Sequence, residues 1–386
     1  MGSTNVALYT IQPGDTLERI AYKLGVSTAG LLCLNDFSPT EKLVTGQAIL
    51  TPFVRKPLES LGFFQLRDLN GLRETVAKIG PLLTYGSLFE FPVTPAGEIL
   101  VADEANTAGA VYLLESFHVL PLMTLTNLTP EKFDPDLARA VIQDETVKAR
   151  LLVNLATVLE RYRFGGVNID FENVSPDDRT FFSDFIRDLK LTLGAAGYHV
   201  SVTVPPKEAD LPNDAAKGAY SYFDLGQWSD FVFIMTYDWG YLSGPPMAVA
   251  PINEVRKVLS YATTQIPSCR ILQGIPLYGY DWPLPYAPGN RATVVNLMEV
   301  YEMARRYQTE IQFDPVAASP YFNYRDAEDR EHVVWFEDAR SLLIKYQTAR
   351  DLDLGGFGFW YGRNAPYGIP QGWVLLDEMF AIVQEC

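Results

Sequence analysis

Histidine and cysteine are both scarce in this sequence, and their positions exclude several kinds of chemistry. The chain has three of each among its 386 residues: His118, His199, His332, Cys33, Cys269 and Cys386. No histidine lies near a cysteine or another histidine, so we expect no metal site, no cofactor and no histidine-based nucleophile triad. The cysteines are too few and too far apart for a disulfide framework. We interpret them as small buried hydrophobic residues.

Basic residues and long apolar runs are also lacking. The chain has 31 Lys and Arg against 47 Asp and Glu, a formal net charge of −16. A nucleic acid or an anionic membrane surface requires clustered basic residues, so we expect neither partner, and a neutral substrate is the simplest match. No hydrophobic stretch reaches the length of a membrane span, and the first residues lack the apolar core of a signal peptide. We therefore expect no insertion into a membrane.

Hydrophobic residues are abundant enough for a large folded core. They make up 48% of the chain and aromatic residues 13%, which argues against extensive disorder. A chain of this length accommodates one large domain and one small one.

The segment 165–172, Gly-Gly-Val-Asn-Ile-Asp-Phe-Glu, alternates in the manner of a β-strand. One face carries Val167, Ile169 and Phe171, and the other carries Asn168, Asp170 and Glu172. Carboxylates are rarely buried without partners, so a strand that holds two of them on one face indicates a function such as acid catalysis.

An edge strand with its polar face in water is the alternative explanation of this pattern. The surrounding sequence favours a buried strand, because helical segments at 147–163 and 176–193 flank the run. Ser175 and Pro176 predict a helix start, with Ser175 as N-cap and Pro176 at the first helical position. The two carboxylates then lie at the carboxyl end of the strand, where α/β barrels build their active sites.

Apolar strands alternate with amphipathic helices over residues 58–386, which predicts a (β/α)8 TIM barrel. The expected strands are 61–66, 83–89, 120–124, 166–171, 200–204, 231–235, 271–277 and 356–359. A doubly wound open sheet is the second choice, but no G-x-G-x-x-G loop follows the first strand. The long interval between the last two strands predicts a small α+β insertion at about 283–336, forming one wall of a cleft.

Residues 7–52 form a separate pattern, strand-helix-helix-strand, with Thr16 and Ser27 as helix caps. Tyr-Thr-Ile-Gln-Pro-Gly-Asp-Thr-Leu at 9–17 and Gly-Gln-Ala-Ile-Leu at 46–50 resemble the LysM module, which binds N-acetylglucosamine polymers. The resemblance implies a glycan groove between the segments 14–17 and 35–43, lined by Gly14, Asp15, Thr16 and Asn35. A packing domain without ligand affinity is the alternative. Residues 53–57 are the expected linker.

The strand at 165–172 resembles the signature of family 18 glycoside hydrolases, Asp-Gly-x-Asp-x-Asp-x-Glu. Asp170 and Glu172 match its last two acids, whereas Gly165 and Asn168 stand where the family has the first two. Other matching segments are Met-Thr-Tyr-Asp at 235–238, Gly-Ile-Pro-Leu-Tyr-Gly at 274–279 and Gly-Phe-Gly-Phe-Trp at 356–360.

The resemblance implies substrate-assisted cleavage, in which the acetamido oxygen of the substrate attacks the anomeric carbon with overall retention. Glu172 is then the general acid and base, Asp170 holds the acetamido N–H, and Tyr237 donates to the acetamido oxygen. Trp360 stacks on the sugar, Asp238 positions Tyr237 or binds a hydroxyl, and Asn168 supports Asp170 or contacts substrate.

Within this family the chain resembles bacterial spore-germination N-acetylglucosaminidases, which carry LysM modules and act on cortex peptidoglycan. The matching segments are 88–91, 168–174, 201–206 and 335–341. The expected function is therefore a glycosidase of peptidoglycan, associated with the spore or the cell wall. A chitinase with identical chemistry and a non-catalytic glycan-binding protein are the alternatives, and the oligomeric state is left open.

Overall fold

The structure is a computed structural model that describes residues 6–52, 56–66, 69–361 and 368–383. These residues form two compact units, one built on Met1–Lys56 and one on Pro57–Glu378. Residues 53–55 of the predicted linker lie outside the described residues, and so does Cys386. Within the described part of the chain, no helix has the length and apolar character needed to cross a membrane.

The smaller unit has the predicted βααβ order. Its elements are β1 (Val6–Thr10), α1 (Leu17–Leu24), α2 (Thr28–Asn35) and β2 (Ala48–Pro52). The two strands pair antiparallel, with Leu8 opposite Leu50. Thr16 and Ser27 cap the two helices as predicted, because their hydroxyls accept from the N–H groups of Arg19 and Gly30. A small core lies between the elements and consists of Ile11, Leu17, Ile20, Ala21, Leu31 and Ile49.

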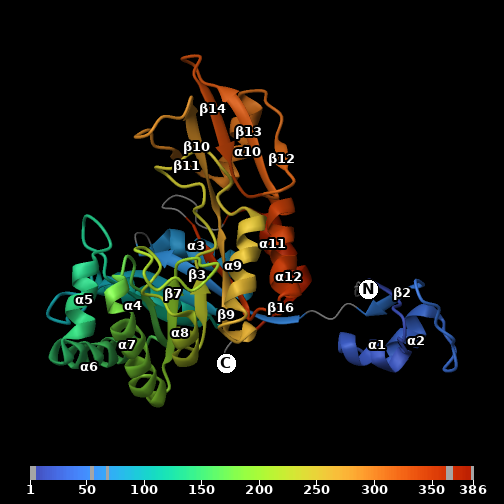
Figure 1. Ribbon diagram of the computed structural model, residues 1–386, viewed down its shortest axis with the longest axis horizontal. Helices are drawn as coiled ribbons and strands as arrows, with labels where there is room; N and C mark the ends of the chain where they lie inside the picture. The colour runs from blue at the N-terminus through green and yellow to red at the C-terminus, as the bar shows by residue number, and fades with distance from the viewer. Residues whose placement is uncertain (1–5, 53–55, 67–68, 362–367, 384–386) are drawn as a thin grey trace. The chain divides into compact units, whose positions relative to one another are not determined.

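The larger unit is a closed barrel of eight parallel strands, as predicted (Figure 1). The strands are β3 (Lys56–Gln65), β4 (Tyr85–Pro92), β5 (Leu120–Thr126), β6 (Gly166–Asp170), β7 (His199–Val204), β8 (Val232–Ile234), β9 (Ile271–Pro276) and β15 (Gly356–Trp360). They lie in the order β15-β9-β8-β7-β6-β5-β4-β3, and β15 pairs with β3, Gly358 opposite Leu61, which closes the barrel.

Helices surround the barrel between its strands. They are α3 (Leu69–Ile79), α4 (Glu104–Ser116), α5 (Pro135–Gln143), α6 (Glu145–Tyr162), α7 (Arg179–Thr192), α8 (Tyr222–Trp228), α9 (Ile252–Ala262), α11 (Ala339–Asp351) and α12 (Pro370–Met379). Short 3-10 turns are η1 (Gly80–Leu82), η2 (Pro176–Asp178), η3 (Gly194–Ala196) and η4 (Ser268–Arg270), and the chain continues after α12 into β16 (Phe380–Ile382).

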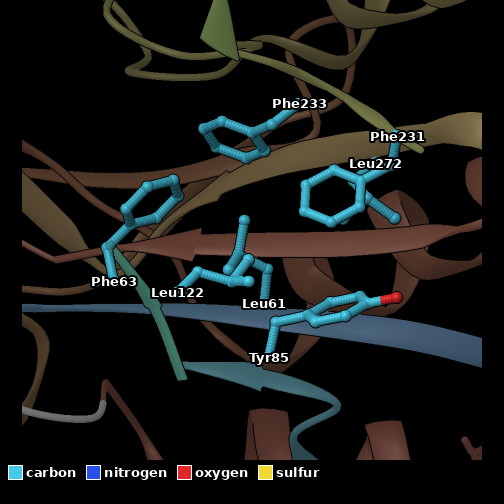
Figure 2. Close-up of a cluster of buried hydrophobic side chains, with 7 residues drawn as sticks. All are labelled: Leu61, Phe63, Tyr85, Leu122, Phe231, Phe233 and Leu272. Atoms are coloured by element: carbon cyan, nitrogen blue, oxygen red, sulfur yellow. The ribbon is translucent and has the colours of Figure 1, made fainter. Parts of the chain in front are cut away.

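Large apolar side chains fill the barrel interior, as Figure 2 shows. Leu61, Phe63, Tyr85, Leu122, Phe231, Phe233 and Leu272 point toward one another from β3, β4, β5, β8 and β9, with Phe231 directly before β8. Gly358 faces this cluster, and a Cβ there would lie 2.3 Å from Cε2 of Phe233, so only glycine fits. The filled interior confines any cavity to the ends of the strands.

The insertion between β9 and β15 is a sheet of five antiparallel strands with one helix. Its strands are β10 (Tyr278–Leu284), β11 (Thr293–Asn296), β12 (Gln312–Asp314), β13 (Ser319–Arg325) and β14 (Glu331–Trp335), and its helix is α10 (Leu297–Arg306). In Figure 1 this insertion stands at the top of the view. It begins at Tyr278, earlier than the predicted residue 283, because β10 follows β9 after a single residue.

Two local predictions need correction. Ser175 and Pro176 occupy the predicted N-cap and first helical positions, but of the 3-10 turn η2; the Ser175 side chain makes no capping hydrogen bond, and the α-helix starts only at Arg179. Cys33 and Cys269 are exposed rather than buried. Cys33 lies on α2 of the small unit and Cys269 in η4, positions that neither core encloses.

Candidate active site

The two acids of β6 lie where the strand leaves the barrel. Asp170 ends β6 and is only 6% exposed, and Glu172 follows two residues later. Both side chains border a cavity of about 420 Å³. Phe171 between them points outward and stacks on Phe182 and Phe185 of α7, with ring centroids 6.3 and 5.8 Å away. The predicted division of the strand into an apolar and an acidic face is therefore present.

Close packing explains why glycine stands at 165 and 166. A Cβ on Gly165 would lie 2.4 Å from Cδ1 of Leu120, and one on Gly166 would lie 2.3 Å from the carbonyl oxygen of His199. Neither position accepts a side chain without movement of its neighbours. The family's first acid, at position 165, would therefore have to displace the Leu120 side chain.

Asn127 holds the backbone of Glu172 in place. Its Oδ1 accepts from the Glu172 N–H at 2.9 Å, and its Nδ2 donates to the Glu172 carbonyl at 2.8 Å and to the Asp134 carbonyl at 2.9 Å. Asn127 is fully buried and follows β5, the strand next to β6. Asn127 was not among the predicted site residues, although a polar residue directly after an apolar strand is a signal for one.

The environment raises the pKa of both acids. Burial, and then the charge of Asp238, raise the pKa of Glu172 to about 7. Burial, followed by the charges of Glu172 and Glu90, raises the pKa of Asp170 well above its usual range. Oδ1 of Asp170 is buried and has no hydrogen-bond partner among the described residues. The site thus presents an acid poised near neutrality beside an open acceptor.

This pKa predicts a pH profile for the enzyme. Glu172 must hold a proton to donate one, so kcat/KM should fall as the pH rises through about 7. Replacing Asp238 with Asn removes a negative charge that raises the Glu172 pKa, so the fall should move to lower pH. Initial rates from about pH 5 to pH 9 measure both profiles. An unshifted profile in Asp238→Asn would contradict this electrostatic role.

Tyr237 and Asp238 follow β8 and border the same cavity. Burial, and then the charge of Asp170, raise the pKa of Tyr237, so its hydroxyl keeps its proton and remains a donor. Asp238 accepts hydrogen bonds from Tyr278 at 2.7 Å and Tyr280 at 3.2 Å, both on β10 of the insertion. A Cβ at Gly274 would lie 2.5 Å from the carbonyl oxygen of Ile234 and 2.9 Å from Cε1 of Tyr237, which together account for that glycine.

Trp360 at the end of β15 forms part of the wall. Its ring meets Phe63 and Phe89 edge-on, at centroid distances of 5.7 and 5.1 Å. It borders the catalytic cavity and also a second cavity of about 860 Å³ beside it. The insertion contributes Arg291 and Val294 to this second cavity, so it forms part of a cleft wall as expected.

Asn168 does not have the predicted contact with substrate. It is fully buried below the acids, and its amide donates to Thr203 at 2.9 Å and accepts from Ser201 at 3.0 Å. Both partners belong to β7. These bonds tie β6 to β7 instead of reaching Asp170 or the cavity, so its role is support of the strand.

The four residues of the small unit that were predicted to bind glycan are not equally free to contact a ligand. Asn35 bonds to the backbone of Leu31 and Leu50, which occupies both its oxygen and its nitrogen, so it ties α2 to β2. Asp15 accepts from the Tyr9 hydroxyl and the Gln12 N–H. Gly14 adopts φ +82°, which favours glycine, and Thr16 caps α1. The structure therefore gives Asn35 a structural task, and only the 14–16 loop stays a candidate contact.

Comparison with known proteins agrees with this geometry. The sequence model of glycosyl hydrolases family 18 matches residues 138–363, and that of the LysM domain matches residues 9–52. The chain belongs to family 18. It is a glycosidase by this membership, and its LysM domain and family 18 barrel both point to a glycan as the bound substrate.

Two relatives of this family 18 protein align with nearly its whole chain, and a chitinase aligns with most of it. The cortical fragment-lytic enzyme of Bacillus subtilis is 34% identical over 98% of this chain and 99% of its own. The crystal structure of the Bacillus cereus spore cortex-lytic enzyme SleL, 34% identical, superposes with a TM-score of 0.82 over 98% of this chain and 87% of that chain. A chitinase from Chromobacterium violaceum, 26% identical, superposes with a TM-score of 0.75 over 83% of this chain and 98% of that one.

Proposed function

We propose that this protein is a retaining N-acetylglucosaminidase that cleaves β-linked N-acetylglucosamine bonds in peptidoglycan, with spore-cortex fragments as its substrate. The observation that carries the proposal is Glu172, with its pKa raised to about 7, beside the unbonded buried oxygen of Asp170. The similarity to a cortical fragment-lytic enzyme over almost the full chain supports the choice of peptidoglycan.

In the first step Glu172 gives its proton to the glycosidic oxygen while the bond to the anomeric carbon breaks. The acetamido oxygen of the same sugar attacks that carbon and forms a cyclic oxazolinium ion. Asp170 accepts the acetamido N–H at its free Oδ1 and stabilises the positive charge of the ring. Tyr237 donates its hydroxyl to the acetamido oxygen, and Trp360 supports the apolar face of the sugar.

In the second step Glu172, now a carboxylate, takes a proton from water as the water oxygen attacks the anomeric carbon. The bond to the acetamido oxygen breaks, and the two inversions give net retention. In this scheme the charge of Asp238, which accepts hydrogen bonds from Tyr278 and Tyr280, helps to keep the pKa of Glu172 raised. The 14–16 loop of the LysM domain adds affinity for the same polymer, because tethering two glycan sites raises the effective concentration. Such a protein acts at the spore or the cell wall.

Comparing two substrates tests this proposal. The purified protein is given muropeptide fragments of cortex peptidoglycan and, separately, chitooligosaccharides, and new reducing ends are counted while NMR records the product anomer. We expect β-anomers with N-acetylglucosamine at the new end, released mainly from the cortex fragments. Turnover of chitooligosaccharides alone would identify a chitinase. Turnover of neither would identify a glycan-binding protein, and an α-anomer would exclude the retaining mechanism.

A further inference from the structure

The barrel interior has an apolar side and a polar side. The apolar cluster of Figure 2 comes from β3, β4, β5, β8 and β9, whereas hydroxyl and amide groups come from β4 to β7 and bond to one another across the strands. The hydroxyls of Ser87 and Thr124 meet at 2.6 Å. Asn168 donates to Thr203 at 2.9 Å and accepts from Ser201 at 3.0 Å. Polar groups below the catalytic acids are thus paired with one another.

The layer that holds Asp170 contains two buried oxygen atoms that lack such a bond. Thr126 ends β5, and Asp170 ends β6. Oγ1 of Thr126 and Oδ1 of Asp170 are both buried, and neither has a hydrogen-bond partner in the part of the chain that the structure describes. An unpaired buried hydroxyl costs stability, so one that lies next to a catalytic acid indicates a use other than structural support.

The two residues are direct neighbours in the barrel. Thr126 lies opposite Asp170 in the parallel register of β5 and β6. Adjacent strands lie about 4.8 Å apart, and side chains alternate between the two faces of a strand. Leu122, on the same face of β5 as Thr126, belongs to the interior cluster, so Thr126 points into the barrel as Asp170 does. A hydroxyl one bond beyond Cβ reaches a carboxylate oxygen across this gap by rotation of one side chain.

The backbone at this end of β5 is fixed. The Thr126 carbonyl accepts from the Val93 N–H at 2.9 Å. The next residue, Asn127, holds the backbone of Glu172 through its side chain. Of two consecutive residues, one therefore serves Glu172 and the other lies beside Asp170.

The mechanism gives Asp170 a need for a hydrogen-bond donor. Burial, and then the charges of Glu172 and Glu90, raise the pKa of Asp170, yet the proposed reaction requires its charged form beside the ring cation. A hydroxyl that donates to the carboxylate favours the charged form. Because a carboxylate oxygen has two lone pairs, Oδ1 can accept from this hydroxyl and from the acetamido N–H at once.

We propose that Thr126 is a positioning residue for Asp170: its hydroxyl donates to the carboxylate and holds it, in the charged form, toward the acetamido group of the bound sugar. This inference rests on the proposed function and adds a further residue to the same step. Thr126 forms no covalent bond and transfers no proton, so it acts only through Asp170.

The first test measures the pKa of Asp170 by carbon NMR of the side-chain carboxyl groups, with Asp170→Asn to assign the signal. Thr126→Val removes the hydroxyl and keeps the shape, so the pKa of Asp170 is expected to rise by about 1. Thr126→Ser keeps the hydroxyl and should leave this pKa nearly unchanged. Glu172, Glu90 and Tyr237, whose charges interact with Asp170, are the same in these variants. An unchanged pKa in Thr126→Val would overturn the proposal.

The second test measures kcat/KM on cortex fragments. Thr126→Val is expected to lower it by about 10- to 100-fold, the range for a hydrogen bond to a charged group, and Thr126→Ser should restore most of it. In an Asp170→Asn background, Thr126→Val should have almost no further effect. An equal loss in the two backgrounds would show that Thr126 does not act through Asp170.

Thr124→Val is the matched control. It removes the same hydroxyl from the same strand two residues earlier, where Ser87 is its partner. Because it leaves that partner unpaired, Thr124→Val should lower Tm with little effect on kcat/KM, whereas Thr126→Val should not lower Tm. An equal fall in Tm for both variants would refute the proposal, because the Thr126 hydroxyl would then have a structural partner. The NMR and Tm measurements do not depend on turnover, so they test Thr126 even if the wild type hydrolyses neither substrate, a result that would refute the proposed function alone.

Discussion

Glu172→Gln is expected to lower kcat by about 100- to 10,000-fold while the protein still binds glycan, because the amide neither gives nor takes a proton. The substitution keeps the shape of the side chain, and the bonds from Asn127 reach only the backbone of residue 172, so the geometry should persist. Rates on cortex fragments and affinities by calorimetry measure the two effects.

Glu98→Gln is a suitable control for this variant, since Glu98 is exposed and lies outside the cleft. It removes one carboxylate, as Glu172→Gln does, and should leave rate and affinity unchanged. Wild-type turnover by Glu172→Gln would mean that another group supplies the proton. Loss of binding together with turnover would show a damaged site and not a missing acid.

Asp170→Asn is expected to lower kcat by at least about 100-fold for a different reason. It replaces the acceptor of the acetamido N–H and removes a charge that stabilises the ring cation, and losing one such electrostatic partner typically costs about 100- to 1000-fold. A substrate with a good leaving group separates the two acids. Because departure of that group needs little protonation, Glu172→Gln should regain much of its first step, whereas Asp170→Asn should not.

Thermal unfolding supplies the control for Asp170→Asn. The pKa of Asp170 is raised in the folded state. Above the ordinary carboxyl pKa the folded protein therefore holds a proton that the unfolded chain has lost. The free energy of unfolding falls as the pH rises, because Asp170 has to give up this proton in a buried place. Asparagine has no such cost, so the variant should be at least as stable as the wild type near neutral pH. A large loss of stability would point to a structural cause of inactivity.

The sequence predicted the barrel well because each strand is a short apolar run followed by polar residues. All eight predicted strands overlap β3 to β9 and β15, and the resemblance to family 18 on which the acids depended is confirmed. Asn127 was not predicted, because its role depends on the parallel register of β5 and β6, in which Thr126 lies opposite Asp170. The partners of Asn168 likewise depend on the register of β6 with β7. Such long-range pairings leave no pattern in either strand alone.

Tyr278 and Tyr280 tie the inserted sheet to the chemistry of the barrel. Both hydroxyls donate to Asp238, and burial together with the charge of that carboxylate keeps both tyrosines protonated. The catalytic site of the barrel therefore depends on the insertion. A barrel trimmed at β9 and β15 would leave Asp238 without two donors and would change the acidity of Glu172 as well. Of the inserted strands, β10 is the one whose side chains reach Asp238, so the acidity of the site depends on this strand.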